Sequence, residues 1–101
     1  MRIVVLFNLK PGVDPAAYEA WARGFDIPGV NALSSVDGFT VHRTTGLFGS
    51  DAPAPYQYVE IIDIKAMEPF VADISTEAFQ KVAAAFGDYA DNPQFMLTQD
   101  L

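Results

Sequence analysis

The sequence lacks the residue types on which several classes of functional site depend. None of its 101 residues is a cysteine, which excludes disulfides, thiolate-bound zinc, iron–sulfur clusters and cysteine nucleophiles. His42 is the only histidine, so a metal site built from several histidines is excluded as well. No glycine-rich motif for phosphate or nucleotide binding is present. We therefore expect a protein that works without a cofactor or a metal.

Basic residues are also scarce. Six lysines and arginines stand against thirteen aspartates and glutamates, which gives a formal net charge of −7. Nucleic acids and anionic membrane surfaces are bound through basic stripes or clusters, so neither is an expected partner. The apolar run at residues 3–7 is interrupted by Asn8 and Lys10 before it reaches signal-peptide length, and no run approaches the ~20 apolar residues of a membrane span. We expect a cytoplasmic protein.

The sequence has the pattern of one α+β domain over residues 1–101. Apolar or alternating segments predict strands, and apolar residues spaced by three and four predict helices. The predicted strands are residues 2–9, 37–45, 56–64 and 94–100. Two helical stripes follow the third strand: Met67, Phe70, Val71 and Ile74, then Phe79, Val82, Ala83 and Phe86. Asp91-Asn92-Pro93 is expected to end the last helix.

An earlier helix is predicted between the first two strands. Asp14 is its expected N-cap, and Pro15 suits its first position. Its apolar stripe is predicted to consist of Tyr18, Trp21, Ala22 and Phe25. Residues 26–35 are expected to be irregular, apart from one short helical turn capped by Asp26.

This order of elements predicts a ferredoxin-like βαββαβ fold, with the helices on one face of a four-stranded antiparallel sheet. The first and third strands are apolar on both faces, and a soluble monomer does not leave that much apolar sheet in water. We therefore expect a homodimer in which a second copy covers the bare face, a dimeric α/β barrel. The alternative cover, the loop 46–55, is too short.

The loop 46–55 is longer than most connections between neighbouring strands. Gly46 and Gly49 can serve as hinges, and Leu47 and Phe48 are apolar side chains in a polar segment. We predict that this loop is a mobile gate of the site or an arm that contacts the partner.

Several segments, in order along the chain, resemble one protein family. They are KPGV before Asp14-Pro15 with Tyr18 and Trp21, Asp26-Ile27-Pro28, Arg43-Thr44-Thr45-Gly46, and Tyr58-Val59-Glu60. Over nearly the whole chain the sequence resembles the REDY-like protein HapK family. The resemblance implies a dimeric α/β-barrel protein of bacterial secondary metabolism, associated with gene sets for prodiginine pigments, that handles a pyrrole or similar intermediate. It does not specify a reaction.

Glu60 is the most informative candidate for chemistry. It interrupts an apolar strand on the face shared by Tyr58 and Ile62. Burial there raises the pKa of a carboxyl group unless a cation lies beside it, which would make Glu60 a general acid or base. The alternative is a structural carboxylate paired across the strands. Its candidate partners are Arg43, the hydroxyl groups of Tyr58 or Tyr18, and a ligand.

His42 and Arg43 are consecutive on the neighbouring strand and point to opposite faces of the sheet. Only one of them can therefore share the side of Glu60. His42 is a candidate catalytic residue, although a lone histidine is also common on a surface. Arg43 is a candidate for binding an anionic group of a ligand, or for pairing with Glu60.

The remaining candidates could bind or act on an aromatic ligand. Asp26 either caps the turn after it or faces the sheet beside Trp21 as a further catalytic residue. Tyr18 and Trp21 are core residues or a platform on which a flat ring stacks. Tyr58 and Phe48 complete the predicted binding residues.

Three functions fit these observations. The first is a biosynthetic protein that binds a small aromatic or heteroaromatic metabolite in an apolar pocket and acts on it by cofactor-free acid–base chemistry, in a condensation, cyclisation or isomerisation. The second is a cofactor-independent monooxygenase of the same architecture, an expectation that rests on fold analogy. The third is a non-catalytic ligand-binding protein. Turnover of a pyrrole substrate with and without oxygen distinguishes them.

Overall fold

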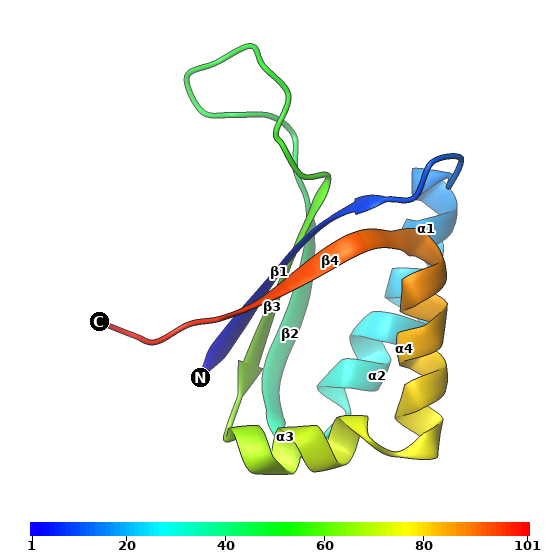
Figure 1. Ribbon diagram of the computed structural model, residues 1–101, viewed down its shortest axis with the longest axis vertical. Coiled ribbons are helices and arrows are strands. Elements are labelled where there is room, and N and C mark those ends of the chain that lie inside the picture. Colours follow the sequence, from blue (N-terminus) through cyan, green and yellow to red (C-terminus); the bar gives the residue numbers. More distant parts are fainter.

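Four strands form one antiparallel sheet in the computed structural model, which describes residues 1–101 (Figure 1). The strands are β1 (Arg2–Leu9), β2 (Val36–Arg43), β3 (Tyr58–Ile64) and β4 (Ala90–Leu97). Their order across the sheet is β2-β3-β1-β4, so the two most apolar strands lie in the centre. This confirms the predicted α+β class and the ferredoxin-like arrangement.

All helices lie on one face of the sheet (Figure 1). They are α1 (Pro15–Trp21), the π-helical turn η1 (Ala22–Asp26), α2 (Ile27–Asn31), α3 (Met67–Ile74) and α4 (Glu77–Tyr89). As predicted, Asp14 caps α1, since its side chain accepts a hydrogen bond from the amide of Ala16. Thr76 caps α4 by accepting from the amide of Phe79. The helices and the sheet enclose the hydrophobic core between them.

The alternation of side chains divides the central strands between a covered and a bare face. Under the helices lie the buried residues Ile3, Val5, Phe7 and Leu9 of β1 and Tyr58, Glu60, Ile62 and Ile64 of β3. On the bare face lie the partly exposed residues Val4, Leu6, Val59 and Ile61. The register places Val5 and Val41 on either side of Glu60. Glu60 is therefore at the middle of the sheet, on its covered face.

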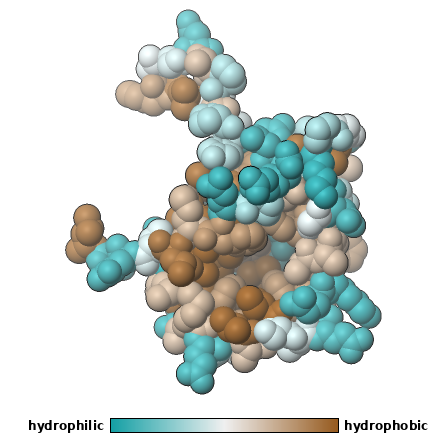
Figure 2. Space-filling view, in the orientation of Figure 1, coloured by the Kyte–Doolittle hydropathy of each residue, from teal (hydrophilic) through white to brown (hydrophobic).

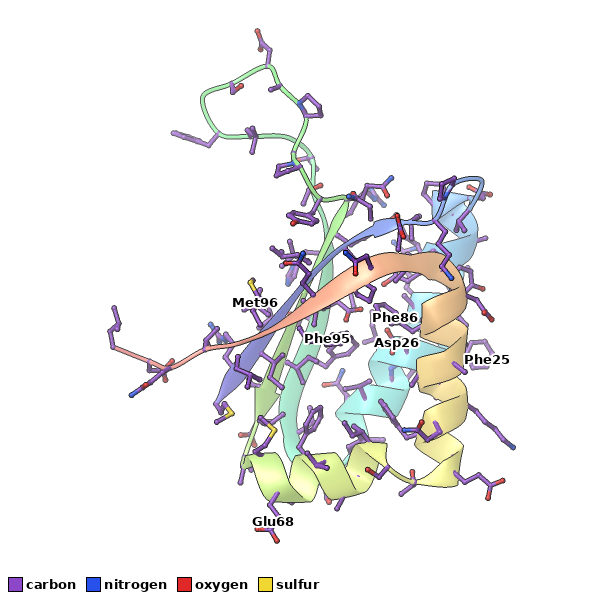
Figure 3. The ribbon with its side chains drawn as sticks, in the orientation of Figure 1. Phe25, Asp26, Glu68, Phe86, Phe95 and Met96 are labelled. Atoms are coloured by element: carbon purple, nitrogen blue, oxygen red, sulfur yellow. The ribbon has the colours of Figure 1, made fainter.

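The helical segment after α1 differs from the sequence prediction. Residues 27–31 continue as a helix, and Asp26 makes no capping hydrogen bond with its side chain. The amide of Ile27 instead donates to the carbonyl of Ala22, five residues back, which closes the wide turn η1. Phe25, which was predicted to face the core, is 66 % exposed and points away from the sheet (Figure 3).

The π-helical turn explains which side chains face the sheet. The buried residues of this segment are spaced by four: Tyr18, Ala22, Asp26 and Val30. In a regular α-helix with about 3.6 residues per turn, residues four apart drift by about 40° at each step. The extra residue in the wide turn takes up this drift. Asp26 therefore faces the sheet in place of Phe25.

The last strand also begins earlier than predicted. Helix α4 ends at Tyr89, and β4 starts at Ala90, passing through Asn92 and Pro93, which were expected to lie outside it. Asn92 has a positive φ of 46°, and the pairing of β4 with β1 shifts at this point. Because β4 is an edge strand, Pro93 can lie in it although it lacks an amide hydrogen.

The connection between β2 and β3 extends away from the body of the protein (Figure 1). Leu47 and Ser50 form an isolated bridge near its tip, where Phe48 is fully exposed. In Figure 1 this loop and the C-terminal end both extend on the side of the bare face, away from the helices.

Candidate functional site

A cavity of about 360 Å³ lies between the sheet and the helices. Fourteen of its seventeen lining residues are hydrophobic, and Figure 2 shows the hollow near the centre of the view, with hydrophobic residues around it. Phe86 of α4 and Phe95 of β4 approach each other edge to face, with ring centroids 6.4 Å apart (Figure 3). Phe95 is 57 % exposed, so it lies where the cavity opens to solvent. The volume is within the range of small-molecule sites.

Two buried carboxyl groups interrupt this apolar lining. Glu60 is 3 % exposed at the middle of β3, and Asp26 is 5 % exposed at the end of η1. The remaining polar lining residue is Gln80 of α4. No lysine, arginine or histidine lines the cavity. The two carboxyl groups therefore share an apolar space without a cation of the protein.

Burial, together with the nearby charge of Asp26, raises the pKa of Glu60 to about 8. The Tyr18 hydroxyl group donates a long hydrogen bond of 3.5 Å to Glu60 Oε2, which opposes this shift only in part. Burial also raises the pKa of Asp26, to about 6. Asp26 loses its proton first, so its charge is present when Glu60 titrates. Near neutral pH the pair holds one proton and one negative charge.

Tyr18 and Trp21 support the site from behind and do not line the cavity. Tyr18 is fully buried, and its ring packs edge to face on Phe7 and Tyr58, at centroid distances of 5.6 and 4.8 Å. Trp21 is half-buried against Tyr18, at 6.2 Å. Of the two alternatives for these residues, the structure supports a core role, in which Tyr18 positions Glu60.

Arg43 shares the covered face with Glu60 but pairs with a different carboxylate. Its guanidinium group donates two hydrogen bonds to Glu19 of α1, at 2.6 and 2.8 Å, and the Tyr58 hydroxyl group donates to Glu19 at 2.8 Å. Hydrogen bonds from Arg43 and Tyr58 lower the pKa of Glu19 to about 2. The suggested Arg43–Glu60 pair is therefore wrong. Because the Glu19 pairing joins residues 24 positions apart, no local pattern indicated it.

His42 and Phe48 are separated from the other candidates. His42 is exposed on the bare face, where a ring nitrogen lies 2.9 Å from the Thr40 hydroxyl group. Phe48 is fully exposed in the loop between β2 and β3. Neither residue, nor any other of the loop 46–55, lines the cavity around Glu60. The loop therefore does not cover the cavity of its own chain in this structure, and its role as a mobile gate or as a partner-contacting arm stays a prediction.

The aromatic walls of the cavity were not predicted as binding residues. Phe79 and Phe86 of α4, and Phe95 of β4, line it. Their signal in the sequence was the apolar stripe of the last helix, which indicates packing equally well. No group of three or more histidine, aspartate or glutamate side chains is arranged to hold a metal ion. No helix is long and apolar enough to cross a bilayer.

Comparisons with known proteins agree with this architecture. The sequence matches the family described as REDY-like protein HapK over residues 1–101, and no curated protein sequence matches it. The crystal structure of HapK from Hahella chejuensis is similar, with 29 % identity over 98 % of this chain and 93 % of that chain and a TM-score of 0.74.

Two more distant structures share the fold. SnoaB from Streptomyces nogalater, a cofactor-independent oxygenase, is 16 % identical over 99 % of this chain and 92 % of its own, with a TM-score of 0.73. A dimeric ferredoxin-like protein of unknown function from Thermobifida fusca is 17 % identical over 94 % of this chain and 85 % of its own, with a TM-score of 0.72.

Proposed function

Because the chain belongs to the REDY-like protein HapK family, we propose that it is a biosynthetic protein that acts on a small aromatic or heteroaromatic metabolite by cofactor-free acid–base chemistry. The observation that carries this proposal is the pair of buried carboxyl groups, Glu60 and Asp26, in an apolar cavity of ligand size. The family resemblance favours a pyrrole-containing intermediate of prodigiosin-type pigment biosynthesis as the substrate.

The two carboxyl groups differ in protonation near neutral pH, which divides the roles between them. Glu60, with its pKa raised to about 8, holds a proton that it can give to a ligand atom. Asp26, with its pKa raised to about 6, is ionised and can accept a proton from another atom. One proton given and one taken is a net isomerisation. The same two transfers assist a condensation or cyclisation in which water leaves.

We also propose that the working form is a homodimer joined through the bare face of the sheet. Val4, Leu6, Val59 and Ile61 form an aliphatic centre on this face that no helix covers. A second copy would cover it, as the sequence predicts. The loop 46–55 extends on the same side (Figure 1), where it could reach the partner.

Turnover assays on pyrrole aldehydes and ketones test the proposed chemistry. We expect Glu60→Gln and Asp26→Asn each to reduce turnover by about 100-fold or more, since each removes a group that transfers a proton. Glu68→Gln is the matched control, because Glu68 lies on the far side of α3 and points away from the cavity (Figure 3). Its turnover should equal that of the unaltered protein.

Each other outcome has a definite meaning. Full activity of Glu60→Gln would contradict the acid–base role. A requirement for oxygen would favour a cofactor-independent monooxygenase, so every assay is repeated without oxygen. Tight binding of these compounds without turnover would show a non-catalytic ligand-binding protein.

A further inference from the structure

The charge of the cavity is not balanced by the protein. Arg43, whose position in β2 lies on the covered face, is paired with Glu19. Helices α3 and α4, and strands β1, β2 and β4, contribute apolar side chains and Gln80 to the lining. The other titratable group that faces the pair is the Tyr18 hydroxyl group, which is committed to Glu60. The Asp26 carboxyl group has no hydrogen-bond partner in the protein.

An unpaired charge in apolar surroundings is costly, and the cost is offset when a partner of opposite charge supplies hydrogen bonds. Near neutral pH the pair carries one negative charge and one remaining proton. A neutral ligand that filled the cavity could donate a hydrogen bond to this carboxylate, as a pyrrole N–H does, but it would leave the negative charge uncompensated in apolar surroundings. An anionic ligand would be repelled. A ligand with one positive charge on nitrogen would supply both the charge and the donors that the protein lacks.

We propose that the cavity takes a lipophilic cation: a flat apolar ring system with one protonated nitrogen, held between Asp26 and Glu60 while its rings contact Phe86 and Phe95. This inference rests on the proposed function and narrows its substrate class. The net charge of −7 acts in the same direction, because it attracts cations to the protein as a whole.

Three probes with one ring system and different charges test the inference. They are 1-naphthylmethylamine, a cation, 1-naphthalenemethanol, which is neutral, and 1-naphthaleneacetate, an anion. Calorimetric titration of the purified protein near neutral pH should show the amine binding about tenfold or more tightly than the alcohol. The acetate should bind most weakly.

The pH dependence of this preference tests it without any substitution. The amine stays protonated from about pH 5 to about pH 8, whereas Asp26 loses its proton within this range. The preference for the amine should therefore grow as the pH rises. Binding of the alcohol should not grow with it. A preference that does not change over this range would contradict a role for Asp26.

The double substitution Asp26→Asn with Glu60→Gln keeps the shape of the cavity and removes both acids. We expect it to bind the alcohol as before and to lose the preference for the amine, while Glu68→Gln keeps it. If the double variant does not fold, Asp26→Asn alone serves, since it removes the charge present at neutral pH. A preference that survives in a folded variant would overturn the inference. Equal binding of amine and alcohol by the unaltered protein would overturn the inference about charge, but it would still support the proposal that the cavity binds a small aromatic ligand. Failure of every probe to bind would overturn both.

Discussion

The two faces of the sheet carry similar aliphatic side chains on the same strands, yet they meet different surroundings. On the covered face, helices bury Val5 and its neighbours but leave room around two carboxyl groups. On the bare face, Val4 and its neighbours are partly exposed with no helix above them. The charged pair there, Arg2 with Asp63 at 2.8 Å, stands at the end of the strands in contact with water. The covered face thus contains the candidate site, and the bare face is the surface on which we propose that a second copy packs.

Two glutamates of the covered face show what decides the chemistry. Glu19 and Glu60 each accept a hydrogen bond from a tyrosine hydroxyl group. Glu19 also has Arg43, and the pKa of its carboxyl group falls to about 2, whereas Glu60 has no cation and its pKa rises to about 8. Burial without a cation, and not the kind of acid, separates a carboxyl group that can exchange protons near neutral pH from a structural carboxylate.

The largest effects are expected when the same charge is placed on each face of the sheet. Val5→Asp puts a carboxylate into the core, where an unpaired charge costs several kcal/mol, and we expect unfolded or insoluble protein. Val4→Asp puts it on the bare face, and we expect loss of the dimer with the fold largely kept. Light scattering and circular dichroism distinguish the two results. A dimer that withstands Val4→Asp, or unaltered protein that is monomeric at micromolar concentration, would show that this face is not the interface.

The next largest effect concerns stability against pH. Because the pKa of Glu60 is raised from 4.5 to about 8 on folding, the folded state holds its proton, and stability falls as the pH rises through this interval. Glu60→Gln should remove this loss of stability. The free energy of unfolding of the variant, relative to the unaltered protein, should therefore increase with pH, from no difference near pH 4 to about 3–5 kcal/mol above pH 8. Asp63→Asn is the control on the bare face. Arg2 lowers the pKa of Asp63, so the small contribution of the Asp63 carboxylate to stability is present at neutral pH and lost in acid. Thermal midpoints over this pH range check both signs; parallel curves for Glu60→Gln and unaltered protein would contradict the first.

A smaller effect is expected from removing the cation of Glu19. Arg43→Met should raise the pKa of Glu19 toward its ordinary value, because Arg43 is the largest cause of its lowering. The stability difference should be present at neutral pH and vanish as the pH falls toward about 2, and it should amount to no more than a few degrees in thermal midpoint because Arg43 is exposed. Arg23→Met, which removes the longer contact of 3.3 Å, should change this pKa less. The chemical shift of the Glu19 carboxyl carbon in an NMR titration measures this pKa directly. An unchanged Glu19 titration in Arg43→Met would mean that Tyr58 alone holds the carboxylate.

The smallest effect is predicted for the loop near the bare face. Phe48→Ser should leave the thermal midpoint of the folded chain unchanged, since Phe48 contacts no core residue. It should weaken dimerisation modestly if the loop contacts the partner. Sedimentation at decreasing protein concentration measures this, with Asp51→Ser in the same loop as the control. Equal dimer dissociation constants for the two variants would contradict a contact between Phe48 and the partner.

Local chemistry made much of the fold predictable. The bounds of β1 and α3 follow from apolar runs and periodicity, and the cap at Asp14 follows from its side chain. The burial of Glu60 was predicted from its place in an apolar strand between Tyr58 and Ile62, whereas the face of the sheet on which it lies was not. These features depend on residues close together in the sequence.

The site was less predictable because it depends on distant pairings and on one irregular turn. Nothing near Arg43 indicates that Glu19 lies beside it, since the contact forms only when α1 packs on the sheet. A regular helical period placed Phe25 in the core and made a cap the simpler role for Asp26, with a position facing the sheet as the alternative. The wide turn reversed these positions, and no residue type in that segment marks it.

The turn η1 also ties the chemistry of the cavity to the length of the chain. It acts as a one-residue insertion in an otherwise continuous helix. An in-frame deletion of one residue among 22–25 would restore the regular helical period and keep Asp26 facing the sheet, because Asp26 would then lie seven positions after Tyr18. A regular helix through the full-length segment would instead turn Phe25 toward the sheet. Relatives that lack one residue here would therefore present the same carboxyl group from a regular helix, so an alignment must place the gap within this turn before the residues that face the cavity can be compared.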